Sequence, residues 1–196
     1  MTPMNSEKES HTVNVASHLK RMAQIKPYKR AVVYPAGRDN HGRVTYSHLT
    51  FLRLDRESDC LAHGFEKAGI TRGVRTILMV KPGLEFFMII FALFKTGAVP
   101  VVVDPGMGMR RMVDCFKQGR PHAFIGIPAA HMLPTFYPKY FNTVRTWITV
   151  GRRWFLKGVT LDRVRQVPWR PYTTAQTRRD ETAAILFTTG STGPAK

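Results

Sequence analysis

Two apolar strands with one helix between them constrain the fold of this chain more than any other feature. The segments Val74–Val80 and Val99–Val103 are nearly continuous apolar runs, as expected of strands buried on both faces of a sheet. The helical segment between them is apolar nearly all round and should be deeply buried. Glu85 near its start and Lys95 and Gly97 at its end suit the helix dipole and the C-cap. We expect a right-handed crossover between parallel strands, and therefore an α/β fold with mostly parallel sheets layered with helices.

Further elements are predicted on both sides of this unit. Before it, residues 13–26 have helical periodicity, and a turn within residues 37–46 is expected to join a strand at residues 31–35 to a second strand. Ser47 is expected to cap a long helix that ends near Gly69. After the unit we expect a basic helix at residues 109–118 and strands at residues 122–127, 146–150 and 182–187.

The charge of the chain is strongly positive and unevenly distributed. Lys and Arg number 30 against 13 Asp and Glu, which gives a formal net charge of +17. Residues 139–179 contain ten of these basic residues, all three tryptophans and a single acid, Asp162. Basic residues interleaved with aromatic ones are typical of surfaces that bind nucleic acid or an anionic membrane. The other interpretation, which we favour, is a solvated face whose acidic partners lie elsewhere.

Other features of the sequence exclude several kinds of site. Cys60 and Cys115 fit no disulfide or metal spacing and are expected to be reduced thiols. The seven histidines are scattered, so no metal site is assigned. Residues 1–12 are polar and contain two glutamates, which excludes a secretory signal. The longest apolar run, Phe86–Phe94, is too short to span a bilayer, and we expect a cytoplasmic protein.

The last eleven residues, LFTTGSTGPAK, carry the most specific chemistry. Glycines let the backbone approach a ligand closely, and successive backbone N–H groups can converge on an anion. Hydroxyl groups add donors, and a lysine supplies positive charge for a phosphate oxygen. The predicted phosphate-binding residues are Thr188, Thr189, Gly190, Ser191, Thr192, Gly193 and Lys196.

Two other interpretations of this loop exist. A P-loop, GxxxxGK[ST], would align Gly190 with its first glycine and Lys196 with its lysine. That pattern needs glycine where this chain has Ala195, so it fails at one position. A flexible turn rich in Gly, Ser and Thr stays open on the residues alone.

A family resemblance extends beyond the loop. The segment ILFTTGSTGPAK resembles the phosphate-binding signature of the adenylate-forming superfamily, which includes acyl-CoA synthetases, luciferases and peptide-synthetase adenylation domains. Gly69–Gly106 resembles the upstream core of that superfamily, including its element at Leu93–Pro100, and RVTYSHL resembles its early Thr-Tyr-x-x-Leu element. Two positions depart from the usual pattern, because Ala195 stands where proline is usual and Thr189 where serine is common. Both changes keep the glycines, the hydroxyls and the lysine.

Within the superfamily, three segments are most similar to the β-lactone synthetases of bacterial long-chain olefin biosynthesis: Glu85–Gly106, Ala123–Pro128 and Ile148–Arg153. The resemblance implies a polar tail at residues 1–12 and a partial N-terminal adenylation domain at residues 13–196, truncated at the phosphate-binding loop. The adenine pocket, the ribose-binding aspartate, the magnesium ligand and the catalytic lysine are then expected in sequence that follows. No catalytic residue is therefore assigned, and the chain alone is expected to be inactive.

The implied cofactors are ATP and Mg²⁺, and the implied reaction forms an acyl-adenylate from a long-chain acyl substrate. In the olefin subgroup, a 2-alkyl-3-hydroxy acid would close to a β-lactone. The first alternative is a fatty acyl-CoA synthetase, which uses coenzyme A. The second is a non-enzymatic basic module that binds anions or nucleic acid, although we expect no nucleic-acid partner. The resemblance further implies other olefin-pathway enzymes as partners, and the composition of the basic stretch at residues 139–179 indicates an anionic membrane surface as another partner.

Overall fold

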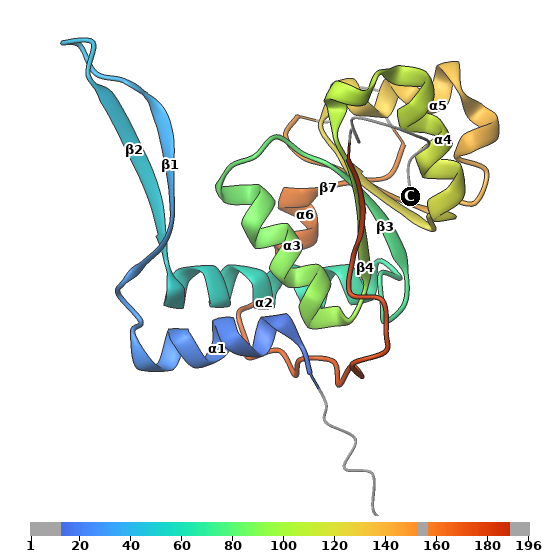
Figure 1. The fold of residues 1–196 in the computed structure, drawn as a ribbon. Helices are drawn as coiled ribbons and strands as arrows, with labels where there is room; N and C mark the ends of the chain where they lie inside the picture. Colours follow the sequence, from blue (N-terminus) through green and yellow to red (C-terminus); the bar gives the residue numbers. More distant parts are fainter. Residues whose placement is uncertain (1–12, 153–156, 189–196) are drawn as a thin grey trace, which may run out of the picture.

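The computed structural model describes residues 13–152 and 157–188 and arranges their strands in two sheets (Figure 1). An antiparallel hairpin projects from the body, and the second sheet has the order β7-β6-β5-β3-β4-β8 with every neighbouring pair parallel. The predicted α/β fold with a mostly parallel sheet is confirmed. The strands are β1 (Arg30–Arg38), β2 (Val44–Thr50), β3 (Arg75–Met79), β4 (Val99–Val103), β5 (Ala123–Gly126), β6 (Thr146–Thr149), β7 (Val159–Thr160) and β8 (Ile185–Phe187).

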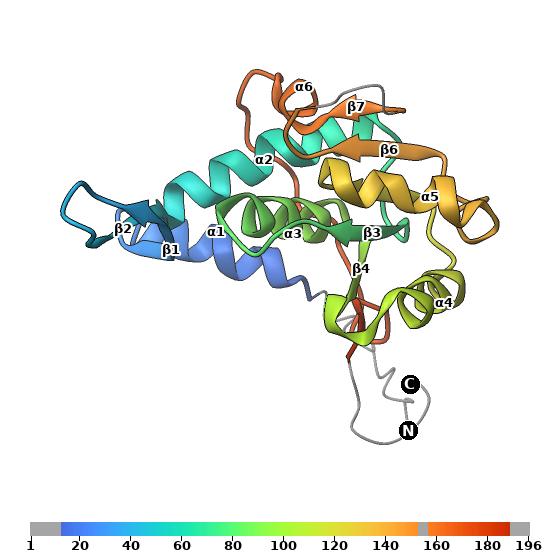
Figure 2. The same cartoon turned by 90° about the horizontal axis from the view of Figure 1, so that it is seen from above.

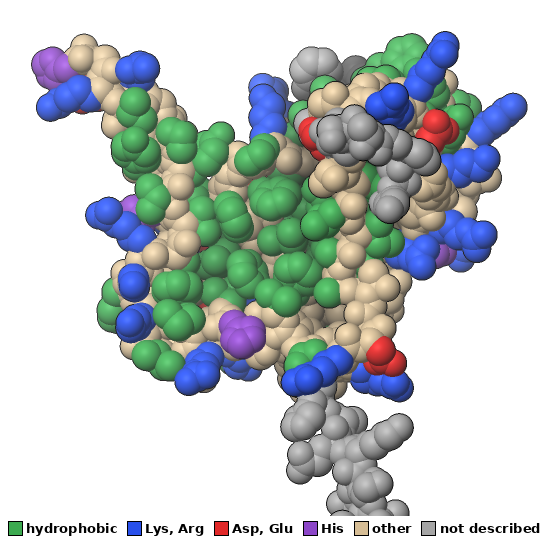
Figure 3. All heavy atoms as spheres, viewed as in Figure 1, with side chains coloured by type: hydrophobic (Ala, Val, Ile, Leu, Met, Phe, Trp, Pro, Cys, Tyr) green, Lys and Arg blue, Asp and Glu red, His purple; other side chains and the backbone are tan. Residues whose placement is uncertain are grey.

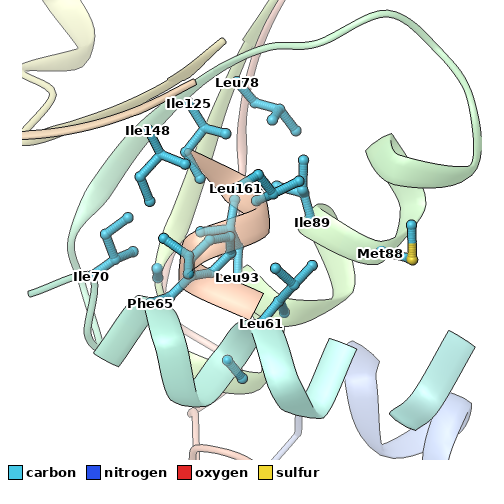
Figure 4. Close-up of a cluster of buried hydrophobic side chains, with 14 of the residues drawn as sticks. Leu61, Phe65, Ile70, Leu78, Met88, Ile89, Leu93, Ile125, Ile148 and Leu161 are labelled. Carbon is cyan, nitrogen blue, oxygen red and sulfur yellow. The ribbon is translucent and has the colours of Figure 1, made fainter. Parts of the chain in front are cut away.

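Helices cover both faces of the parallel sheet (Figure 2). The α-helices are α1 (Val15–Ile25), α2 (Phe51–Lys67), α3 (Leu84–Thr96), α4 (Met109–Gly119), α5 (Leu133–Phe136) and α6 (Leu161–Arg165), and the 3-10 helices are η1 (Pro105–Met107), η2 (Pro128–Met132) and η3 (Pro138–Tyr140). Neighbouring strand residues point to opposite faces, so Leu78 packs against α2, α3 and α6, whereas Ile77 packs against α4 and α5. Figure 4 shows the first of these two clusters, with Leu61 and Phe65 of α2 against the strand residues.

The predicted strand–helix–strand unit is confirmed, because β3 and β4 are parallel neighbours and α3 connects them. Gly97 takes the left-handed conformation expected at a helix C-cap, with φ of 72°. The prediction that α3 is deeply buried is wrong in part. Its Met88 and Leu93 lie in the core, but 37% of Phe87 is exposed.

Lys95 lies in the last turn of α3, as predicted, and its side chain is fully buried. Its Nζ donates hydrogen bonds to Asp59 Oδ1 at 2.6 Å, to Asp55 Oδ1 at 2.7 Å and to the Asp55 carbonyl at 2.8 Å. The two aspartates are four residues apart on α2, so this cluster joins α2 to α3.

The predicted start of the second long helix is also wrong. Ser47 belongs to β2, and the helix begins three residues later with Thr50 as its N-cap. The Thr50 side chain accepts a hydrogen bond from the Arg53 N–H at 3.2 Å. The error arises because Ser47 and Thr50 are both suitable N-caps. In the hairpin, Ser47 pairs with Tyr34 and Thr50 with Arg30, so β2 continues to Thr50 before the helix begins.

Residues 166–177 cross from α6 to the N-terminal helix without regular structure. Asn14, the N-cap of α1, donates from Nδ2 to the carbonyls of Phe94 and Ala175, both at 2.9 Å. The Val13 N–H donates to the Thr177 carbonyl at 2.8 Å. These bonds hold α1 against the end of α3.

Hydrophobic side chains remain exposed between the hairpin and the parallel sheet, over α3 (Figure 3). They include Val33, Tyr34 and Phe87, which are 50%, 39% and 37% exposed. Both cysteines are free, and burial raises the pKa of Cys60 and of Cys115. Within residues 13–152 and 157–188, no helix is both long and apolar enough to cross a membrane.

Candidate phosphate-binding edge

Strand β8 leads the chain to the carboxyl edge of the parallel sheet. It pairs with β4 so that Phe187 lies opposite Val103, and the Asp104 N–H donates to the Phe187 carbonyl at 3.0 Å. Thr188 follows directly and is exposed. In open α/β sheets, ligands bind outside the carboxyl ends of the strands, so the predicted loop begins where such a site is expected.

Only one of the seven predicted phosphate-binding residues, Thr188, belongs to the described part of the chain. The remaining six lie outside it: Thr189, Gly190, Ser191, Thr192, Gly193 and Lys196. The phosphate-binding role stays a prediction for all seven.

The turn after β4 lies directly beside Thr188. Asp104 caps η1, and its Oδ1 accepts a hydrogen bond from the Gly106 N–H at 2.8 Å. A Cβ on Gly106 would lie 3.1 Å from that oxygen, so glycine suits this close turn. Met107 is buried, and its sulfur lies 3.7 Å from the Cys115 sulfur. Asp104 was not predicted as a site residue, although Asp-Pro-Gly after a buried strand signals a turn at this edge.

Positive charge also lies near this edge. Arg110 and Arg111 occupy the first turn of α4, which contains no acid, and both side chains are exposed. Cations oppose the helix dipole at this position, so these two do not stabilise α4. They raise the local electrostatic potential beside η1, which favours anionic ligands.

One histidine is buried near the carboxyl edge. His131 Nε2 lies 3.1 Å from the Ile148 carbonyl and 3.2 Å from Thr149 Oγ1. Burial lowers the pKa of His131, although backbone hydrogen bonds act in the opposite direction. Its ring also packs against Phe124 and Trp147, with centroids 5.0 and 5.9 Å apart. These contacts are those of a core residue.

The described residues bring together no group of three His, Cys, Asp or Glu side chains that could hold a metal ion. A hollow of about 400 Å³ lies at the opposite, amino edge of the sheet, where Gly73, Arg75 and Val99 line it at the starts of β3 and β4. It is therefore separate from the edge where Thr188 lies.

The basic stretch at residues 139–179 does not form one surface. Arg165 of α6 pairs with Glu57 of α2 at 3.6 Å, and Arg178 pairs with Asp180 at 2.6 Å. Trp147 packs in the aromatic cluster with Phe124, and Arg56 stacks over Trp169 at 4.7 Å. Trp154 lies outside the described residues. Two of its arginines therefore pair with acids outside the stretch, one of them on another helix, which agrees with the solvated-face interpretation.

Comparison with known proteins gives consistent matches along the chain. The AMP-binding enzyme family matches residues 19–196. An olefin β-lactone synthetase of Xanthomonas campestris is 43% identical over 185 residues, which cover 93% of this chain and 33% of that protein. The corresponding protein of Stenotrophomonas maltophilia is 41% identical over 93% of this chain and 34% of its own length. A medium-chain fatty-acid–CoA ligase of Escherichia coli is 28% identical over 92% of this chain and 31% of its own length.

Solved structures share the fold. Acetoacetyl-CoA synthetase from Streptomyces lividans superposes with a TM-score of 0.78 at 20% identity, over 94% of this chain and 29% of that one. The Mycobacterium smegmatis MbtA apo structure gives a TM-score of 0.75 at 21% identity, over 100% of this chain and 36% of that one. The chain thus spans about a third of the length of the proteins it matches.

Proposed function

Because this chain belongs to the AMP-binding family of adenylate-forming enzymes, we propose that the whole protein activates a carboxylic acid with ATP. The carboxylate oxygen attacks the α-phosphorus of ATP, pyrophosphate leaves, and the enzyme holds an acyl-adenylate. We assign residues 13–196 to the first part of the adenylation domain and residues 1–12 to a polar tail. We place the enzyme in the cytoplasm.

In this proposal the loop at residues 188–196 binds the β- and γ-phosphates. Its hydroxyls, backbone N–H groups and Lys196 ammonium are donors that match phosphate oxygens. Among the described residues, the position of Thr188 supports this proposal. Thr188 lies at the carboxyl edge of the sheet, next to the turn that the Asp104–Gly106 hydrogen bond stabilises. The loop contains no carboxylate, so a carboxylate ligand for Mg²⁺ would have to come from elsewhere in the protein. Bound Mg²⁺ would neutralise charge on the transferring phosphates.

We further propose that the substrate is a long-chain 2-alkyl-3-hydroxy acid that closes to a β-lactone. The 3-hydroxyl oxygen attacks the activated carbonyl, its proton is lost to solvent or a base, and AMP leaves with the electron pair of the acyl–oxygen bond. Ring strain opposes this step, but attack within one molecule gains a large effective molarity. The observation that carries the proposal is 43% identity over 93% of the chain to an olefin β-lactone synthetase.

The test uses the full-length enzyme with ATP, Mg²⁺ and a long-chain 2-alkyl-3-hydroxy acid, with and without coenzyme A. We expect AMP release and a β-lactone without coenzyme A. The matched control is the 2-alkyl acid without the hydroxyl, which should stall at the adenylate because it lacks a nucleophile. Strict dependence on coenzyme A, with an acyl thioester as product, would refute lactone formation but not adenylation.

A fatty acyl-CoA synthetase is the second candidate, in which coenzyme A thiolate attacks the same carbonyl. The E. coli fatty-acid–CoA ligase supports it with 28% identity over 92% of this chain. We rank it below lactone formation because the identity is lower over the same span. Other olefin-pathway enzymes are proposed partners only in the first case.

A non-enzymatic module that binds nucleic acid is the weakest candidate. The feature that favours it is tryptophan interleaved with basic residues, but Trp147 is partly buried and packs against Phe124, and Arg56 stacks over the Trp169 ring. The family match over residues 19–196 also favours an enzyme.

A further inference from the structure

The segment that includes α4, α5 and η3 is rich in basic residues. Residues 109–152 contain seven Lys and Arg residues and one acid, Asp114. Within the described parts of the chain none of the seven forms an ion pair, whereas Arg43, Arg72 and Arg178 elsewhere each pair with a carboxylate. The seven are Arg110, Arg111, Lys117, Arg120, Lys139, Arg145 and Arg152. Lys and Arg side chains follow the margin of the molecule where α4 lies (Figure 3).

Three of these cations surround one hollow. The space, about 780 Å³, lies between the C-terminal half of α4 and η3, and Lys117, Arg120 and Lys139 line it with the single acid Asp114. Arg120 holds the left-handed conformation, with φ of 43°, that glycine or asparagine usually takes at a helix end. The chain therefore places a cation at this hollow despite a conformational cost.

Apolar side chains are exposed on η2 and α5, the two elements that lead into η3. Phe136 at the end of α5 is 70% exposed, and Met132 at the end of η2 is 47% exposed. They are four residues apart in a continuous helical run, so they lie on the same side of it. Phe136 precedes Lys139 by only three residues, and α5 lies at the periphery of the molecule, far from the hairpin (Figure 1). We call Met132 and Phe136 the apolar lip.

We propose that this hollow and its apolar lip form a docking surface for an anionic membrane. Cations attract the acidic headgroups, and exposed apolar side chains next to them insert at the boundary with the acyl chains. The charge complementarity comes from three cations against one acid at the hollow. Single-stranded nucleic acid is bound by several aromatic faces in succession, whereas here Phe136 is exposed but Trp147 is packed against Phe124. An acidic protein could bind through the cations alone, so that binding would not explain why Met132 and Phe136 are exposed.

This inference does not depend on the proposed reaction. Another exposed groove, of about 350 Å³, is apolar and is lined by Leu19 of α1 and by Phe87 and Phe91 of α3. It does not involve α4, which packs on the opposite face of the sheet from α3. The docking surface therefore stays available if that groove is covered.

The test is co-sedimentation of the full-length protein with phosphatidylcholine vesicles, with and without phosphatidylserine. We expect binding only when phosphatidylserine is present, and weaker binding as salt screens the charges. The combined variant Lys117→Gln, Arg120→Gln and Lys139→Gln should lower the partition coefficient by at least about tenfold. Phe136→Ser should lower it several-fold at every salt concentration, because its contribution is apolar.

A matched control removes the same charge from another exposed surface, through Arg21→Gln, Lys26→Gln and Lys29→Gln. It should leave the partition coefficient within about twofold of the original. If the control loses as much binding as the hollow variant, net charge alone drives association and the proposal fails. It also fails if polyglutamate binds the protein while phosphatidylserine vesicles do not. Lys139→Gln alone, as a single surface change, repeats the test should the combined variant not fold.

Discussion

Replacing Lys95 with methionine should destabilise the contact between α2 and α3 by roughly 3–5 kcal/mol, the usual cost of breaking a buried ion pair. Methionine keeps most of the side-chain length but removes the ammonium group. The side chains of Asp55 and Asp59 are only 14% and 7% exposed, so water cannot readily replace the lost donor. Three acceptors within 2.8 Å of Nζ lose their partner at once. The cost should exceed by far that of a surface ion pair.

Amide hydrogen exchange on the full-length protein measures this locally. Since about 1.4 kcal/mol corresponds to a factor of ten, exchange of the most protected α2 and α3 amides should accelerate by roughly two to four orders of magnitude. The matched control is Lys67→Met, because Lys67 also occupies the last turn of a helix but is exposed. Its loss removes only a helix-dipole interaction, worth about 0.3–1 kcal/mol.

A second variant separates charge from packing. Adding Asp55→Asn and Asp59→Asn to Lys95→Met removes the unpaired charges and should restore part of the protection. Equal exchange rates in Lys95→Met and Lys67→Met would refute the reasoning, because the lysine would then act only on the helix dipole.

Three other predictions concern separate features. Gly190→Val or Gly193→Val in the full-length enzyme should lower ATP–pyrophosphate exchange by at least about tenfold with little change in melting temperature; early melting with normal activity of the folded remainder would make these glycines structural. Burial lowers the pKa of His131, so the unfolded state binds its proton first, and stability should fall as pH drops through the unfolded value of about 6.5. His131→Gln should flatten that dependence in thermal melts from pH 8 to pH 5, about the range where histidine titrates, and an unchanged slope would count against it. The 196-residue chain alone should self-associate through the exposed face around Phe87, and Phe87→Ser should reduce light scattering; a sharp monomer peak for the unmodified chain would contradict this.

Periodicity predicted the parts of the fold that local sequence determines. The runs that became β3 and β4 and the helix between them were identified because burial on both faces leaves few polar residues. Ser47 was mistaken for the N-cap because Ser and Thr are both good caps, and only hairpin pairing decides between them. For Lys95 the sequence predicted only an interaction with the helix dipole. The two aspartates that pair with it could not be identified, because they lie about 40 residues earlier, on another helix.

The site was predictable in part. The loop chemistry could be read from hydroxyls, glycines and lysine, yet its identification depended on family resemblance, because a short glycine-rich match is common. The Asp104 turn was missed because its role depends on β8 lying next to β4, two strands separated by more than 80 residues. The sequence treats the basic residues at 139–179 as one stretch, although in the fold Trp147 packs against Phe124 and Arg165 pairs with Glu57 of α2.

The pairing of β8 with β4 also has a consequence for folding order. β8 has three residues, lies at the edge of the sheet, and leaves Leu186 62% exposed, so few contacts repay the entropy of closing such a long loop. During synthesis, β8 can pair with β4 only after the chain up to Phe187 has left the ribosome. Among the described strands of the sheet, β8 beside Thr188 should therefore be the last to assemble and the first to fray. A nucleotide that binds only the assembled edge would slow that fraying, so the substrate itself would complete the maturation of its own site.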